Sequence, residues 1–220
     1  MFFQELSMTY IIYLALSLAI AFSVHEFAHA YSAYRFGDNT AARQGRLTLN
    51  PIKHLDPIGT ILFFIVGFGW ARPVPVNRFN FKNPRLAGII VSVLGPISNL
   101  LLAVLGTILI YLLFYLDLTS DYFYTFSEFL HFFVRINILL FVFNLIPLPP
   151  LDGYRIVEDL LPYSVRPTLV KLEPYGSIIF LILIFIDPLY DVTIGVILGD
   201  WVPGIESALH QFFIDLFILR

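Results

Sequence analysis

The chain has 220 residues, of which 58% are hydrophobic and only 13% are charged. A soluble domain usually carries about twice that charge, so the composition favours a membrane protein. The formal net charge of −3 argues against nucleic-acid binding. Because the sequence has no cysteine, it excludes disulfides and thiolate metal sites, and any metal must be held by histidine and carboxylate side chains.

The first apolar segment, Met8–Tyr34, is long enough for a helix to cross the hydrocarbon core, which takes roughly 20 residues. No Lys or Arg precedes this segment, so we expect a retained transmembrane helix and not a cleaved signal peptide. In the polar stretch that follows, Arg46–Asn50 alternates with a period of two residues, which predicts a short strand.

Two shorter segments precede the next long helix. Ile58–Trp70 is apolar but has only about half the spanning length, which favours a re-entrant or interfacial segment. Arg72–Phe81 alternates apolar residues with polar residues and prolines, and its prolines restrict any strand to a sheet edge. We expect this edge to pair with an extended substrate, and Arg46–Asn50 to be its partner strand. A solvated connecting loop is an equally good interpretation.

Leu86–Leu116 predicts a second spanning helix, and Phe129–Leu148 predicts a third, with Asp117–Glu128 between them as a short acidic loop. Small residues recur every three or four positions along the second helix, which allows close packing on a neighbouring helix. These residues are Gly88, Ser92, Gly95, Asn99, Ala103 and Gly106.

The C-terminal part is apolar again over Tyr175–Leu198. Asp187-Pro188 interrupts this segment, so the sequence is compatible with either one broken helix or two short pieces. Ile205–Leu219 is predicted as an amphipathic interfacial helix. Together the segments predict an all-α integral membrane protein. We expect a transmembrane helix bundle of about four to six segments, with a re-entrant segment and a small membrane-associated β element. Residues 1–220 are expected to form a single membrane-embedded domain.

The positions of Lys and Arg predict the orientation. These residues gather between the first and second long helices and after the third, and they are absent from the first seven residues and from Asp117–Glu128. The positive-inside tendency places both basic regions in the cytoplasm and the N-terminus outside, provided that Ile58–Trp70 does not cross.

The sequence His25-Glu26-Phe27-Ala28-His29 is the strongest chemical signal. On a helix, residues four apart share a face, so both imidazoles can reach one metal ion. Glu26 then lies beside the ion as a general base for the attacking water. The alternative, incidental polar residues on a transmembrane helix, is less favoured because ionisable groups in hydrocarbon are costly and usually functional.

A catalytic zinc usually takes three protein ligands and leaves one position open. His25 lies about 25 Å along its helix, given a rise of about 1.5 Å per residue, which places it in the inner leaflet. The helix Phe129–Leu148 runs the opposite way and ends at a similar depth, just before Asp152. Depth therefore nominates Asp152 as the third ligand, whereas Asp152-Gly153 is equally typical of a turn.

Three motifs carry a family resemblance: HEFAH on the first helix, GPISN at Gly95–Asn99 and NLIPLPPLDG at Asn144–Gly153. With them, the chain resembles the site-2 protease family of intramembrane zinc metalloproteases. Arg46–Thr60 resembles the short subgroup of that family, which lacks a PDZ domain. The similarity covers residues 9–163.

This resemblance implies a role for each matching residue. His25, His29 and Asp152 would hold one catalytic zinc ion. Glu26 would be the general base, and Asn144 would bind substrate near the metal. The implied activity is regulated intramembrane proteolysis, the hydrolysis of peptide bonds within or next to the transmembrane segments of membrane-protein substrates.

The resemblance also implies a setting, namely the lipid bilayer of a prokaryotic cell (inner) membrane with the active site toward the cytoplasm. Transmembrane proteins or peptides are the expected partners, and a homo-oligomer is left open. Asn99 matches the asparagine of the middle-helix motif, for which an interhelical hydrogen bond is an equally good interpretation. The alternatives are a metal-binding membrane transporter, disfavoured because the polar residues cluster near one face, and a catalytically silent scaffold, disfavoured by the intact His-Glu-His set.

Overall fold

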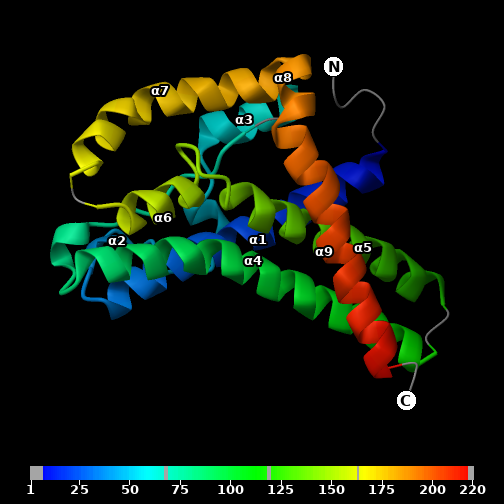
Figure 1. Ribbon diagram of the computed structural model, residues 1–220. Coiled ribbons are helices and arrows are strands. Elements are labelled where there is room, and N and C mark those ends of the chain that lie inside the picture. The colour runs from blue at the N-terminus through cyan, green and yellow to red at the C-terminus, as the bar shows by residue number, and fades with distance from the viewer. Residues whose placement is uncertain (1–6, 67–68, 118–119, 163, 218–220) are drawn as a thin grey trace. The chain divides into compact units, whose positions relative to one another are not determined.

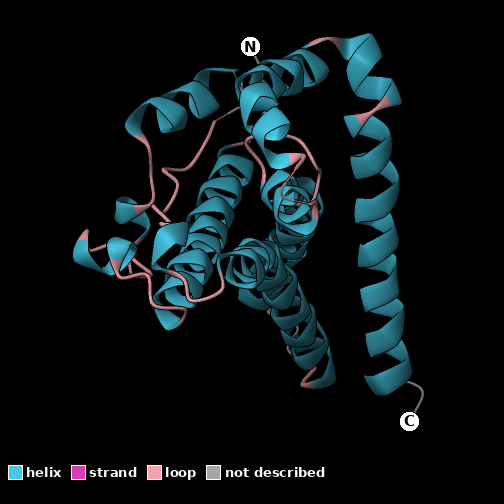
Figure 2. Ribbon diagram, turned by 60° about the vertical axis from the view of Figure 1, so that its left-hand side comes forward, coloured by secondary structure: helices cyan, strands magenta, loops and turns pink. Residues whose placement is uncertain are grey.

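The computed structural model describes residues 7–66, 69–117, 120–162 and 164–217. Within these ranges helices are joined by loops and no strand is formed (Figure 2). The chain divides into two compact units, Met1–Gly95 and Pro96–Arg220, and the boundary falls inside a helix. The expected single domain over residues 1–220 stays a prediction.

The first unit is built on α1 (Met8–Arg35), which matches the first predicted spanning helix (Figure 1). The Ser7 side chain caps its first turn by accepting a hydrogen bond from the Tyr10 N–H at 3.2 Å. Short elements follow in the order α2 (Thr40–Arg43), η1 (Pro51–Lys53), α3 (Pro57–Val66) and η2 (Arg78–Asn80).

The expected β element is not confirmed in the described residues. Arg46–Asn50 is irregular, and Arg72–Phe81 is an extended loop that ends in η2. The two segments meet through a side chain, because the Arg46 guanidinium donates to the Arg72 carbonyl oxygen at 2.6 Å. Pro73 and Pro75 lack the N–H groups that a ladder needs, which explains why period-two alternation produced no strand here.

The ends of the predicted re-entrant segment lie close together. Leu55 and Ala71 form an isolated antiparallel bridge, and a Cβ on Gly59 would lie 2.3 Å from the Trp70 carbonyl oxygen. The part between them contains α3, and residues 67 and 68 lie outside the described residues. That Ile58–Trp70 is re-entrant stays a prediction.

The second and third predicted spanning helices correspond to α4 (Pro84–Tyr115), whose C-terminal part belongs to the second unit, and α5 (Asp121–Asn144). In the described part of the chain, α1, α4 and α5 are long and apolar enough to cross a membrane. The acidic loop prediction was partly wrong, because α5 already begins at Asp121. A carboxylate in the first turn of a helix is favourable next to the helix dipole.

Four helices complete the second unit: α6 (Asp152–Leu160), α7 (Arg166–Phe185), α8 (Asp187–Val192) and α9 (Ile194–Phe217). The apolar segment breaks at Ile186, which is extended. Pro188 lies in the first turn of α8, where a missing N–H is harmless. The short α8 contacts both α7 and α9 (Figure 1).

The predicted interfacial helix Ile205–Leu219 forms, as far as Phe217, the C-terminal part of a longer helix, α9, and its interfacial position stays a prediction. That helix packs against α5, and Ile205 and Leu209 pack on the main core of the unit. The buried residues of this core are Ala103, Ile110, Leu130, Val134, Ile138, Val142 and Val202. The sequence shows the apolar face of α9 but not the partner that covers it.

A polar pair links α4 and α5 inside this unit. Asn99 is fully buried, and its Nδ2 donates to the Asn137 Oδ1 at 3.1 Å. The Asn137 Nδ2 donates in turn to the Phe133 carbonyl oxygen at 2.9 Å. The structure thus confirms the interhelical hydrogen bond as the interpretation of Asn99.

We predict that Gly106→Ala destabilises the protein, because the new Cβ would lie 2.7 Å from the Val134 Cγ2. Overpacking of this kind costs about 1–3 kcal/mol. Gly199→Ala is the matched control, since its Cβ would meet nothing within 4 Å and alanine favours a helix. Thermal unfolding in detergent should show a lower Tm for Gly106→Ala alone. Equal Tm values for the two variants would contradict the tight contact between α4 and α5.

Candidate metal centre

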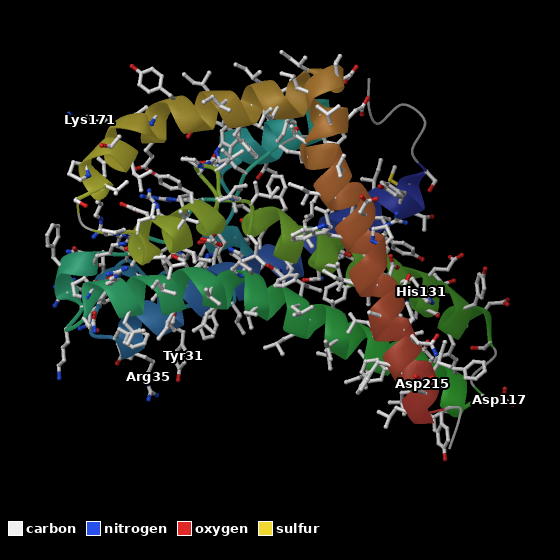
Figure 3. All side chains as sticks on the ribbon, viewed as in Figure 1. Tyr31, Arg35, Asp117, His131, Lys171 and Asp215 are labelled. Atoms are coloured by element: carbon white, nitrogen blue, oxygen red, sulfur yellow. The ribbon has the colours of Figure 1, made fainter. Side chains whose placement is uncertain are left out.

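The two histidines of the motif lie in the C-terminal turns of α1, toward the end of the helix where Figure 3 labels Tyr31 and Arg35. His25 and His29 are both buried, and their Nε2 atoms lie 3.0 Å apart. Two imidazole nitrogens on one tetrahedral zinc lie about 3.3 Å apart, given Zn–N distances of about 2.0–2.1 Å. The separation on α1 therefore fits two nitrogens that bind the same ion.

The second nitrogen of His29 is fixed by α4. Its Nδ1 lies 2.8 Å from the Val91 carbonyl oxygen. A carbonyl can only accept, so Nδ1 carries the hydrogen and Nε2 keeps the lone pair that a metal requires. Backbone carbonyls hold metal-binding histidines in this way and orient the ring.

Gly95 provides the space that the two rings occupy. A Cβ there would lie 2.3 Å from the His29 Nε2 and 2.8 Å from the His25 Cε1. The small residue at this position was predicted to allow close packing on a neighbouring helix. The close approach is to the two imidazoles, so Gly95 serves the site as well as the helix packing.

Glu26 is buried and is oriented by a backbone donor. The Val74 N–H donates to its Oε2 at 2.7 Å. A hydrogen bond to a charged group contributes about 1.5–3 kcal/mol, enough to favour one orientation of the carboxylate. This bond uses Oε2 and does not involve the second oxygen, Oε1.

Asp152 lies in the second unit as the first residue of α6, and it is half-buried. The chain turns sharply just before it, since the Leu151 N–H donates to the Leu148 carbonyl oxygen at 2.9 Å. Gly153 follows in the first turn of α6, where a Cβ would lie 2.3 Å from the Leu145 carbonyl oxygen, so the helix can begin here only with a glycine. The turn interpretation of Asp152-Gly153 is therefore wrong, because both residues belong to α6 and the turn precedes them. The resemblance gives Asp152 the role of a zinc ligand. That role stays a prediction.

Asn144 is the last residue of α5 and is half-buried. Its Nδ2 donates to the Leu140 carbonyl oxygen at 2.9 Å, one turn back on the same helix. This bond steadies the side chain and uses one of the two amide hydrogens. Its expected contact with substrate stays a prediction.

Two partners of the motif were missed by sequence reasoning, namely the Val91 carbonyl and the Val74 N–H. Both are backbone groups, for which residue identity gives no signal. The one indirect signal lay in the prolines on either side of Val74, which leave it as the single backbone donor between positions 73 and 75.

The sequence is similar to those of known proteins. Residues 119–186 match the family described as Peptidase family M50. YwhC of Bacillus subtilis (strain 168), named as a candidate zinc metalloprotease, is 55% identical over 202 residues, which cover 91% of this chain and 90% of the relative. Rip2 of Mycolicibacterium smegmatis, named in the same way, is 32% identical over 166 residues, which cover 73% of this chain and 62% of the relative. No solved structure matches the chain.

We predict that Gly95→Ala weakens metal binding, because the new methyl group displaces the ring of His29 from the position in which Nε2 faces His25. Changes to groups that orient a ligand typically weaken metal binding on the order of 10–100-fold. Gly204→Ala on α9 is the matched control, since its Cβ would meet nothing within 4 Å. Metal affinity is measured by competition with a chelator on detergent-purified protein. Equal affinity for both variants would show that the imidazoles are not held as described.

Proposed function

We propose that this chain, which belongs to peptidase family M50, is a zinc endopeptidase that hydrolyses peptide bonds within or next to the transmembrane segments of membrane proteins. The observation that carries the proposal is the pair of buried imidazoles with Nε2 atoms 3.0 Å apart, one of them fixed by the Val91 carbonyl. The pair lies on α1, a helix long and apolar enough to span a bilayer. A carboxylate, Glu26, is adjacent to the pair in sequence and is itself oriented by a hydrogen bond.

The proposed ligands are His25, His29 and Asp152, which together offer two imidazoles and one carboxylate. Such a set suits zinc in a hydrolase and leaves one position open. When bound, zinc acts as a Lewis acid toward the scissile carbonyl and makes a coordinated water more acidic. The zinc metalloprotease names of YwhC and Rip2 support the same choice of metal.

The remaining chemistry is assigned to protein side chains. Glu26 takes up the proton of the attacking water at Oε1 and later delivers it to the leaving amine, the general-base role that its place in the motif implies. Asn144 contacts the substrate backbone near the reacting bond with its remaining amide hydrogen or its Oδ1. The substrate helix must unwind locally, because a hydrogen-bonded helical backbone is not accessible to attack.

The proposed setting is a prokaryotic inner membrane with the site toward the cytoplasm. Arg35 ends α1 close to the motif and projects from it (Figure 3). The basic region between α1 and α4 follows directly, as the positive-inside tendency requires of a cytoplasmic segment.

We predict that Glu26→Gln retains the metal and loses cleavage, because glutamine keeps the shape of the side chain but cannot accept the proton. The loss of a general base typically costs about 10²–10⁴-fold in rate. Bound zinc and cleavage of a panel of single-span substrates are measured on the same detergent preparation. Wild-type cleavage by Glu26→Gln would overturn the mechanism.

Ligand variants provide the complementary result. His25→Ala, His29→Ala and Asp152→Ala should each lose tight zinc binding together with activity. His131→Ala is the matched control, because His131 is an exposed residue of α5 and has no place in the proposed ligand set. Full zinc occupancy in Asp152→Ala would remove Asp152 from the site.

Cysteine labelling tests the predicted orientation. The method suits this chain because it has no cysteine of its own. Single cysteines at the exposed positions Arg43 and Lys171 should be protected from an impermeant thiol reagent added to intact cells. A cysteine at Arg78, between α3 and α4, should also be protected, whereas one at the exposed Ser120 should be labelled. Labelling at position 78 from outside would mean that Ile58–Trp70 crosses the membrane.

A further inference from the structure

A strap, defined as Arg72–Asn77, lies against Glu26 in the first unit. The Val74 N–H donates to the Glu26 Oε2 at 2.7 Å, and the Val74 side chain is buried in a cluster with Ala30 and Ala41. Val74 is thus held both by its side chain and by its backbone. Pro73 and Pro75 on either side fix their own φ angles and stiffen the strap at this point.

One end of the strap is held by Arg46. This side chain is only 5% exposed, and its Nη2 donates to the Arg72 carbonyl oxygen at 2.6 Å. The Arg72 N–H donates to the His54 carbonyl oxygen at 2.8 Å. This end of the strap is therefore held by one side-chain donor, from Arg46, and by one backbone acceptor, from His54.

The other end is held by Asp38, which is fully buried. Its Oδ2 accepts a hydrogen bond from the Asn77 N–H at 2.6 Å, and its Oδ1 accepts one from the Asn80 Nδ2 at 2.7 Å. Burial alone would raise the pKa of Asp38, but the hydrogen bonds from Thr40, Asn77 and Asn80 outweigh it and lower the pKa below its usual value. Asp38 therefore remains an ionised acceptor at neutral pH.

We propose that Asp38 and Arg46 are positioning residues for Glu26, which act by clamping both ends of the strap so that the Val74 N–H holds the Glu26 Oε2. The clamp keeps the carboxylate in one orientation and leaves Oε1 for the proton. This inference rests on the proposed function for the role of Glu26. The contacts themselves are independent of it, because they join α1, the loop after it and the strap.

Site-resolved hydrogen–deuterium exchange of the zinc-loaded protein in detergent tests the contacts without any substrate. Glu26→Ala removes the acceptor, so the Val74 amide should exchange faster, whereas Glu26→Gln keeps an oxygen and should leave it protected. Asp38→Ala and Arg46→Ala should accelerate the same amide by about tenfold or more, because a freed strap opens locally. Arg43→Ala is the matched control, because Arg43 is an exposed arginine at the end of α2, and this variant should match the wild type.

Kinetics test the role. Asp38→Ala and Arg46→Ala should lower kcat on the order of tenfold to a hundredfold, as expected when a catalytic group is misplaced. KM should change little and zinc should remain at the wild-type level. Arg46→Lys should restore part of kcat, because an ammonium can still donate to the Arg72 carbonyl, and Arg43→Ala should keep wild-type kcat.

Several results would overturn the inference. One is unchanged exchange at Val74 in Glu26→Ala. Another is a Val74 amide that exchanges faster in Asp38→Ala and Arg46→Ala while kcat per zinc-loaded enzyme stays at the wild-type level. A loss of activity explained entirely by lost zinc or unfolding would also do so. Failure of the proposed function would look different, since Glu26→Gln would then cleave normally whatever the strap variants did.

Discussion

The hydrogen bond between the His29 Nδ1 and the Val91 carbonyl oxygen joins α1 to α4 at the metal-binding motif. It fixes the tautomer of His29, so that Nε2 presents a lone pair toward the Nε2 of His25. The bond requires close approach of the two helices, which Gly95 permits one turn further along α4. The imidazole pair, the packing of α1 on α4 and the choice of glycine are therefore one constraint, and a change to any of them moves the others.

The polar side chains in the C-terminal half of α1 show how an apolar helix provides hydrogen-bond partners for buried polar groups. Ser23 and Ser32 bond to carbonyl oxygens of their own helix, at 2.6 Å in each case. Glu26 instead depends on a donor from a distant part of the chain, the Val74 N–H. Because an unpaired buried charge is costly, the loop between α1 and α4 has to bring that donor to the carboxylate. The strap thus helps to keep the charge of Glu26 inside the protein.

Much of this arrangement follows from local pattern. Apolar length was enough to predict α1 and α4, and helical spacing was enough to pair His25 with His29. The errors arise where distant contacts decide. Period-two alternation at Arg72–Phe81 predicted a strand, but three of the four N–H groups of the strap bond to His54, Glu26 and Asp38 in the described structure. Pairing with an extended substrate would have to use the strap's carbonyls and the Val76 N–H. The C-terminal helix was predicted to begin at Ile205, whereas α9 begins at Ile194 and packs against α5, a contact that its sequence does not show.

In the proposed site, His25, His29 and Asp152 hold one zinc ion and leave one coordination position open. Zinc X-ray absorption on the purified protein, combined with metal analysis, tests it most directly. We expect one zinc per chain, two imidazole ligands at about 2.0–2.1 Å and oxygen donors in the remaining positions. The Asp152→Ala variant should lose this spectrum. Fewer than two imidazoles, a stoichiometry other than one, or an unchanged spectrum in Asp152→Ala would contradict the account.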